Sequence, residues 1–299
     1  MAHTGGCMRI GLHALGIGTG ARPEIIESVA RAAEAAGFAT LWSGEHVVMV
    51  DQPSSRYPYS ADGRMAVPPH ADWLDPLLGL AYAAAVTKRI GVATGVLLLP
   101  EHNPVHAAKQ AATLDVLCAG RLTLGVGIGW SADEFAALGV PFERRGQRTT
   151  EYVTAMRRLW ADDACSFDGE FCTFGPIRVN PKPVRSRRIP IVIGGNSDAA
   201  LGRVAACGDG WYGFNVEIHD VRDRLAVLRE QCRRQDRKMS ELTVAVAVSG
   251  CGPGDVPGLA DAGVTELVVL GSPPAEPVTA AVWVDDLARR WGLDPDRKR

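Results

Sequence analysis

The chain has 299 residues, of which 46% are hydrophobic and 22% are charged, and its formal net charge at pH 7 is −2. This balance fits a globular protein with a substantial buried core, and no dense run of Lys or Arg stands beside aromatic residues, so we expect no nucleic-acid partner and no membrane partner. No run of about 20 consecutive apolar residues is present to span a bilayer, and we expect a cytoplasmic protein that acts on a small-molecule substrate.

The cysteines are odd in number, widely spread and without a C-x-x-C pair, which argues against both a disulfide framework and a zinc site. A reducing compartment fits this pattern. The cysteines are Cys7, Cys118, Cys165, Cys172, Cys207, Cys232 and Cys251.

Short apolar runs rich in β-branched residues alternate with segments of helical periodicity, and each run predicts a strand. The eight runs are "MRIGLH" (8–13), "FATLWSG" (38–44), "RIGVATGVLL" (89–98), "RLTLGVGIG" (121–129), "PIVIGG" (190–195), "GWYGF" (210–214), "LTVAVAVSG" (242–250) and "ELVVLGS" (266–272). Helices are expected between them, for example over 23–37, 219–235 and 278–291.

Strands that are apolar throughout are typical of parallel sheets covered by helices on both faces. Eight of them alternating with helices predict an α/β fold, a (β/α)8 TIM barrel, as one domain over residues 1–299. A doubly wound open sheet is the alternative. In a barrel, the chemistry is expected at the carboxyl ends of the strands.

Two connections are longer than ordinary barrel loops, and we interpret them as insertions. Residues 47–74 follow the second strand and are rich in proline, which suggests a wall or lid over the active face. Residues 140–188, between the fourth and fifth strands, contain a helix over 144–160 and then a hairpin that leads into a basic turn.

The fourth strand carries glycine at every second position, at Gly125, Gly127 and Gly129, in "GVGIGW". Two interpretations stay open. The barrel interior is too crowded there for any side chain, or a planar ligand lies against bare backbone. The spacing is not the G-x-G-x-x-G of a dinucleotide loop.

Other strand ends carry polar residues or glycine. The second ends in Glu45 and His46, and histidine suits proton transfer near neutral pH. No further His or carboxylate is spaced to complete a metal site with His46, so an organic cofactor is favoured. The fifth strand ends in Gly194 and Gly195, followed by Asn196 and Ser197 where a helix begins; these residues either cap the helix or bind an anion such as phosphate.

Five stretches, in their order and spacing, resemble the luciferase-like monooxygenase superfamily, and within it most closely the F420-dependent oxidoreductases. They are "LWSGEH" (41–46), "ATGVLLLPEHNP" (93–104), "AATLDVLCAGRLTLGVGIGW" (111–130), "DEFAALGVPFERRGQRTTEY" (133–152) and "IPIVIGGNSDAALGRVAACGDGWY" (189–212). The resemblance implies a luciferase-like barrel with insertions, and FMN or the deazaflavin F420 bound at the carboxyl mouth.

The family's cofactor-binding positions fall on Glu45 and His46, on Gly127 and Gly129, and on the stretch 194–197. Its catalytic histidine falls on His46. A non-proline cis peptide behind the cofactor ring falls on Gly95–Val96. The sequence departs from the sugar-phosphate dehydrogenases of the family, where a glutamate stands in place of Trp130, so sugar-phosphate oxidation is not expected; Glu134 is expected to have a structural role.

The reaction that the resemblance implies is F420-dependent hydride transfer to or from a small, largely apolar substrate. Tyr57, Tyr59, Trp73 and Trp130 are the expected substrate-binding residues. Lys182, Arg185, Arg187 and Arg188 are candidates for the acidic F420 tail, although a solvated turn is the favoured interpretation. The alternatives are an FMNH2-dependent monooxygenase, which draws on a flavin reductase, and a non-catalytic flavin-binding barrel. A homodimer is expected.

Overall fold

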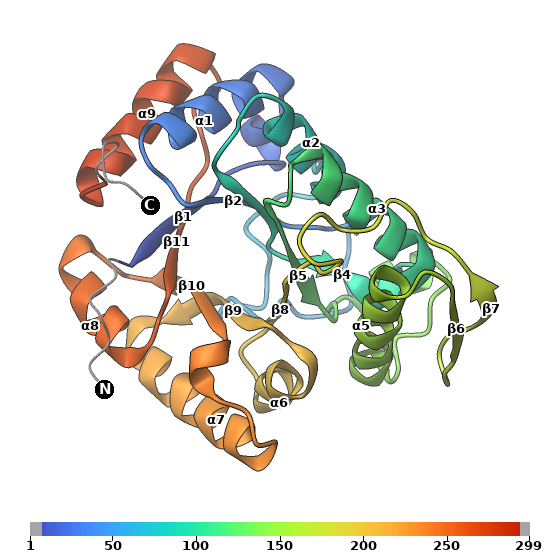
Figure 1. Cartoon of the computed structure of the whole chain (residues 1–299). Coiled ribbons are helices and arrows are strands. Elements are labelled where there is room, and N and C mark those ends of the chain that lie inside the picture. Colours follow the sequence, from blue (N-terminus) through green and yellow to red (C-terminus); the bar gives the residue numbers. More distant parts are fainter. Residues whose placement is uncertain (1–7, 294–299) are drawn as a thin grey trace.

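The computed structural model describes residues 8–293, and within them all barrel strands are parallel and form a closed ring (Figure 1). The sheet order is β3-β2-β1-β11-β10-β9-β8-β5, and the pairing of β3 with β5 closes it. The eight barrel strands are β1 (Arg9–His13), β2 (Thr40–Ser43), β3 (Gly91–Thr94), β5 (Leu122–Gly127), β8 (Ile191–Gly194), β9 (Gly210–Glu217), β10 (Thr243–Ser249) and β11 (Glu266–Leu270). The predicted barrel is confirmed, and the open sheet is not found.

Helices surround the barrel as an outer ring (Figure 1). They are α1 (Pro23–Ala35), α2 (Pro76–Ala85), α3 (Pro104–Leu117), α4 (Ala132–Ala137), α5 (Arg145–Ala161), α6 (Asp198–Cys207), α7 (Val221–Arg234), α8 (Val256–Ala262) and α9 (Pro277–Arg290). Several begin where the sequence offers a cap: the Asp75, Asn103, Ser131 and Ser197 side chains each accept a backbone N–H of the first turn.

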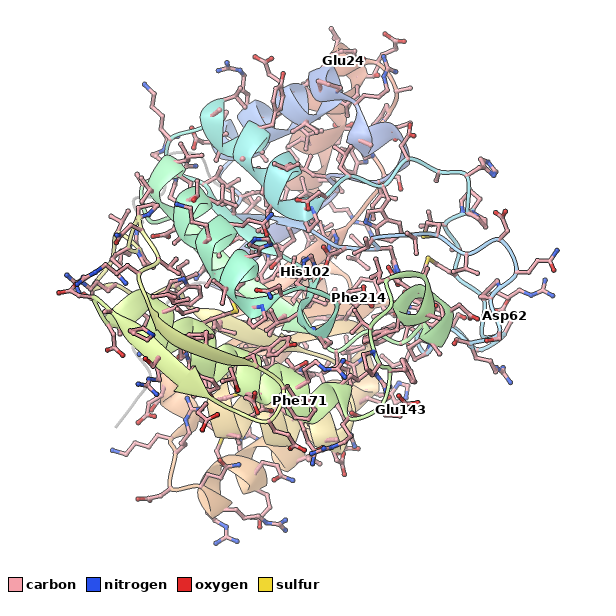
Figure 2. All side chains as sticks on the ribbon, turned by 90° about the vertical axis from the view of Figure 1, so that its right-hand side faces the viewer. Glu24, Asp62, His102, Glu143, Phe171 and Phe214 are labelled. Carbon is pink, nitrogen blue, oxygen red and sulfur yellow. The ribbon has the colours of Figure 1, made fainter. Side chains whose placement is uncertain are left out.

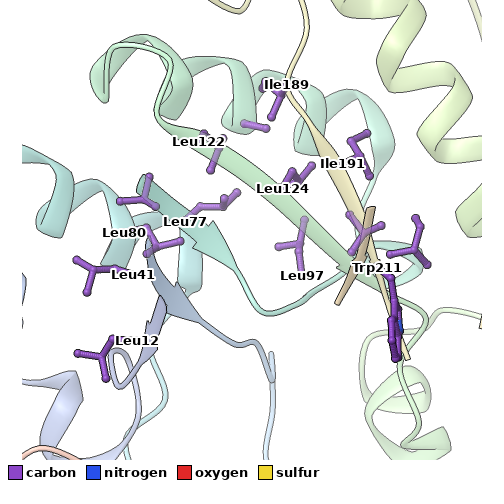
Figure 3. Packing of buried hydrophobic residues seen from close by; sticks show 14 of the residues in the cluster. Leu12, Leu41, Leu77, Leu80, Leu97, Leu122, Leu124, Ile189, Ile191 and Trp211 are labelled. Carbon is purple, nitrogen blue, oxygen red and sulfur yellow. The ribbon is translucent and has the colours of Figure 1, made fainter. Parts of the chain in front are cut away.

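The main core lies between the strands and the helices, where Leu41, Leu80, Leu124 and Ile191 are fully buried (Figure 3). The barrel interior is filled as well. Trp42 stacks on Tyr212 with ring centroids 4.6 Å apart, and its indole N–H donates to Glu266. The interior is therefore packed with side chains, and a ligand has room only at a mouth of the barrel.

Both predicted insertions lie outside the regular barrel. The 47–74 loop projects from the exit of β2, and Figure 2 shows Asp62 at its outer edge. The second insertion contains α5 and the antiparallel hairpin of β6 (Cys165–Asp168) and β7 (Thr173–Ile177), which stands outside the ring of helices beside α5 (Figure 1).

Three further observations concern the described residues. Their six cysteines are free thiols, and Cys7 lies outside the described range. Over residues 8–293 no helix combines the length and the apolar character that crossing a membrane requires. Within the same range no three His, Cys, Asp or Glu side chains are grouped as metal ligands.

Candidate active site

The chain bulges at the exit of β3. The Gly95–Val96 peptide is cis, as the resemblance implied, and the chain then re-enters the sheet as the short strand β4 (Leu97–Leu98), which pairs with β5. A Cβ on Gly95 would lie 3.1 Å from the Trp42 ring and 3.3 Å from Tyr212. The bulge therefore rests directly on the aromatic side chains that fill the barrel.

A buried histidine forms part of the same floor. His13 Nδ1 lies 2.9 Å from the Tyr212 hydroxyl, and burial lowers the pKa of His13 to about 4. His13 is therefore neutral at physiological pH, and the floor beneath the bulge carries no charge from it.

The glycines of β5 make room for protein atoms. A Cβ on Gly125 would lie 2.0 Å from the Thr94 carbonyl oxygen, and one on Gly127 would lie 2.5 Å from Cγ2 of Val96. Gly194 at the end of β8 faces the other methyl of Val96 in the same way, at 2.8 Å. Of the two interpretations of "GVGIGW", these contacts support crowding: Gly127 and Gly194 accommodate the bulge residue, which itself lies at the mouth.

Gly129 differs from the other two glycines because it lies beyond the end of β5. Its φ is +70°, and a Cβ there would lie 2.6 Å from the Phe135 ring. It allows the chain to turn from β5 into α4.

His46 follows β2 and is paired with a carboxylate from α4. Its Nδ1 lies 2.8 Å from Oε2 of Glu134, and these side chains are 9% and 1% exposed. The other oxygen, Oε1, accepts the backbone N–H of Val47 at 2.7 Å and that of Val48 at 3.3 Å. Because the carboxylate accepts these bonds, His46 donates from Nδ1, and its Nε2 makes no hydrogen bond to a described residue.

Glu134 therefore does more than the structural role that its sequence context suggested. It fixes the start of the 47–74 loop through two backbone N–H groups, and it also orients the His46 ring and selects its tautomer. Eighty-eight positions separate the two residues, so local spacing could not reveal the pair.

Aromatic rings from three segments form a continuous arc around His46. Trp73 and Trp130 meet the imidazole edge-on, with centroids 4.8 and 5.8 Å from it. Tyr57 continues the arc from Trp130 at 5.3 Å, Tyr59 follows Tyr57 at 5.5 Å, and the arc ends on Phe214 of β9 at 5.3 Å from Tyr59. The four residues predicted to bind substrate thus lie together beside His46.

Phe214 was not among the predicted site residues. It lies in the "GWYGF" strand, where an aromatic residue is expected in the core, and Figure 2 shows it toward the centre of the molecule, well inside the tip of the 47–74 loop.

Polar contacts hold the 47–74 loop over the mouth. The Ser54 hydroxyl donates to Asp133 of α4 at 2.8 Å, and the Asn215 amide of β9 donates to the Tyr59 carbonyl at 2.9 Å. The Trp73 indole donates to the Gly44 carbonyl at 3.0 Å. Because its contacts reach both β2 and β9, the loop forms a wall across the barrel opening.

Glu45 points away from the ring arc. Its carboxylate accepts the Leu98 backbone N–H at 2.6 Å and lies 3.0 Å from Nε2 of His102. Those bonds tie the end of β2 to β4 and so brace the bulge from behind. The structure does not bring this carboxylate to His46, although the two residues are adjacent in the chain.

A third glutamate, Glu101, lies close to Glu45 and Glu134 and has no partner. Both carboxyl oxygens are buried without a hydrogen bond, and Oε1 is 3.0 Å from the position of a Cβ on Gly129. Burial, and then the charges of Glu134 and Glu45, raise the pKa of Glu101 to about 9. At neutral pH Glu101 is therefore a neutral acid beside two partnered carboxylates.

The exit of β8 has the local structure of a capped helix. The Ser197 hydroxyl accepts the Ala200 N–H at 3.2 Å, so the capping interpretation is confirmed. Gly195 has a φ of +114°, and the Asn196 amide donates to the Phe214 carbonyl at 2.8 Å while its Oδ1 is buried without a partner. That unpartnered oxygen fits a ligand that donates a hydrogen bond at this strand end.

The basic turn lies at the opposite end of the barrel. Arg185 and Arg188 line a cavity of about 1460 Å³ formed by the amino ends of the strands, and Lys182 and Arg187 donate to α5 carbonyls and to Asp163. These four side chains lie at the end of the barrel opposite the carboxyl mouth, which favours the interpretation as a turn over the interpretation as an anion site.

Comparison with known proteins agrees with this geometry. The profile of the family described as luciferase-like monooxygenase matches residues 8–251. An uncharacterized protein of Mycobacterium tuberculosis is 36% identical over 264 residues, which cover 88% of this chain and 92% of that protein.

Two matches with named activities are more distant. The FMNH2-dependent dimethylsulfone monooxygenase of Pseudomonas putida is 33% identical over 153 residues, covering 48% of this chain and 42% of that enzyme. An F420-dependent secondary alcohol dehydrogenase, solved with an F420–acetone adduct, superposes with a TM-score of 0.77 at 17% identity, covering 98% of this chain and all of that one.

The closed parallel barrel and the family profile together place the chain in a class of flavin- or F420-dependent oxidoreductases and monooxygenases. The chain belongs to the luciferase-like monooxygenase family.

Proposed function

We propose that this protein is an F420-dependent oxidoreductase that moves a hydride between the deazaflavin and a small, largely apolar organic substrate. The observation that carries the proposal is the His46–Glu134 pair enclosed by aromatic rings at the barrel mouth. A bound deazaflavin would supply or accept the hydride. The residues present fit such a ring, because an aromatic floor lies under the bulge and the Asn196 oxygen lacks a partner.

His46 would transfer the proton that accompanies the hydride. Glu134 holds Nδ1 in its protonated form, so Nε2 is the nitrogen that faces the reaction. The rings of Tyr57, Tyr59 and Trp130 would bind the apolar part of the substrate and exclude water.

The substrate pocket has little anionic character. Burial and the neighbouring Tyr59 raise the pKa of Tyr57 to about 12, so this phenol is neutral at physiological pH. Trp130 occupies the place of the glutamate found in sugar-phosphate dehydrogenases of the family, and its ring meets both His46 and Tyr57. This supports an apolar substrate over a sugar phosphate.

An FMNH2-dependent monooxygenase is the second candidate. The 33% identity to the dimethylsulfone monooxygenase, which extends over 48% of this chain, favours it. Anaerobic titration of the apoprotein with F420 and with FMN separates the two. The first proposal predicts that F420 binds and that its reduced form is consumed with substrate. Tight binding of FMN with no binding of F420 would overturn it.

A further inference from the structure

Two arginines, one at the start of α5 and one in the second turn of α6, have no acidic partner among the described residues. Arg145 begins α5, and its Nε donates to the Gly129 carbonyl at 3.1 Å while its guanidinium lies 3.8 Å from the centre of the Phe142 ring. Arg203 lies in the second turn of α6 and forms no hydrogen bond or ion pair with any residue of the described chain; its Nε is buried.

The two side chains lie near each other where α5 packs against α6. A Cβ on Gly146, the second residue of α5, would lie 2.9 Å from Nη1 of Arg203. Helical side chains lean toward the amino end of their helix, so Arg203 extends toward the mouth. Burial lowers the pKa of both guanidinium groups, and the charge of Arg145 lowers that of Arg203 further.

A half-buried cation without a counter-ion is costly, and proteins normally pair it. Other half-buried arginines of the described chain have partners: Arg157 pairs with Asp209, and Arg237 donates to three carbonyl oxygens. The acid at the start of α6, Asp198, pairs with Arg224 of α7 on the other flank of the helix. On the α5 side of the helix, Arg145 and Arg203 form no ion pair with any described residue.

We propose that Arg145 and Arg203 form a binding site for a phosphate group, the phosphate of the cofactor under the function proposed above. A guanidinium presents parallel N–H donors that match phosphate oxygens. The site adjoins the loop after β5 and the start of α6. The predicted cofactor contacts, residues 194–197, directly precede α6.

The test compares ligands that differ only in phosphate. Oxidised FMN and riboflavin share the ring and the ribityl chain, so the ratio of their dissociation constants, measured by fluorescence quenching, isolates the phosphate contribution. The wild-type protein is expected to bind FMN at least about tenfold more tightly than riboflavin, and Arg203→Met to lose about tenfold or more in FMN affinity with riboflavin affinity unchanged. If F420 alone binds, the phosphate-free deazaflavin core and its 5′-monophosphate form the pair.

Arg234→Met on α7 is the matched control, because its exposed guanidinium pairs with Glu230 far from the mouth. Arg145→Met should repeat the effect of Arg203→Met. An unchanged ratio in both variants, or equal losses for both ligands in a variant that keeps the wild-type circular dichroism spectrum, would overturn the proposal.

Failure of the proposed function has a different signature. If neither FMN nor F420 binds the wild-type protein, the cofactor assignment is wrong, and the anion site is then tested with inorganic pyrophosphate. A rise in the melting temperature of the wild-type protein that Arg203→Met abolishes supports the site, and an equal rise or no rise in both refutes it.

Discussion

The unpartnered carboxyl of Glu101 makes the stability of this protein depend on pH in a way that one substitution should remove. Its pKa is raised from 4.5 to about 9 by burial and by Glu134 and Glu45. Between these two values the folded state holds a proton that the unfolded state has released, so the free energy of unfolding falls as pH rises. The slope for one proton is about 1.36 kcal/mol per pH unit.

Between pH 6 and pH 8, Glu101 lowers the free energy of unfolding by at most about 2.7 kcal/mol. This upper value applies to a carboxyl that stays fully protonated in the folded state. Glu101→Gln keeps the shape and cannot titrate. Urea unfolding of the apoprotein at pH 6, 7 and 8 should therefore show a shallower decline for the variant, with the largest stabilisation at pH 8. Contributions from groups such as His13 cancel in the comparison.

Glu230→Gln is the control for this measurement. Its exposed carboxyl has a pKa lowered to about 2 by hydrogen bonds from Arg233 and Arg234, so it is ionised across the whole range and its replacement should leave the slope unchanged. Identical pH dependence of wild type and Glu101→Gln would show that Glu101 is ionised in the folded protein, and the description of the buried acid would be wrong.

Three further substitutions test the site. Glu134→Gln should lower kcat by about tenfold to a thousandfold through His46 while cofactor affinity changes little, and a normal kcat would refute the pairing. Gly127→Ala places a methyl 2.5 Å from Val96 and should cost about 1–3 kcal/mol in urea unfolding, whereas Gly175→Ala, with open space around it, should not. Ser197→Asp keeps a helix cap but places a negative charge beside the proposed phosphate, so it should abolish cofactor binding at unchanged stability. Cofactor affinity equal to that of the wild type would refute a phosphate site at this strand end.

The fold could be predicted from the sequence because barrel strands are buried on both faces and their apolar runs are continuous. Each of the eight runs contains a strand. The differences are local: the run at 89–98 is divided into β3 and β4 by the bulge, and β9 continues past Phe214 to Glu217 because it pairs with β10 beyond an irregular register.

The site was predictable only in part. His46 and the aromatic residues of the loop are visible as residue types at a strand end, and the structure brings them together. The partner of His46 was not visible, because Glu134 reaches it from a helix that follows a different strand. The electrostatics of Glu101 and Arg203 were equally hidden, since a missing partner can be recognised only when all neighbours are placed.

The basic turn shows why barrel topology matters. Its four cations were candidates for an anion site, with a solvated turn favoured, and the turn precedes β8 and so lies at the amino ends of the strands. In a barrel, a loop lies near the active site only if it follows the carboxyl end of a strand, and amino-acid composition does not show which end a loop adjoins.

The central claim is that the mouth around His46 binds a deazaflavin. The most direct measurement is the absorbance spectrum and mass of the cofactor that co-purifies with the protein from a host that makes F420. Our account predicts F420 in the purified protein. Stoichiometric FMN with no F420 would contradict it and would favour the monooxygenase.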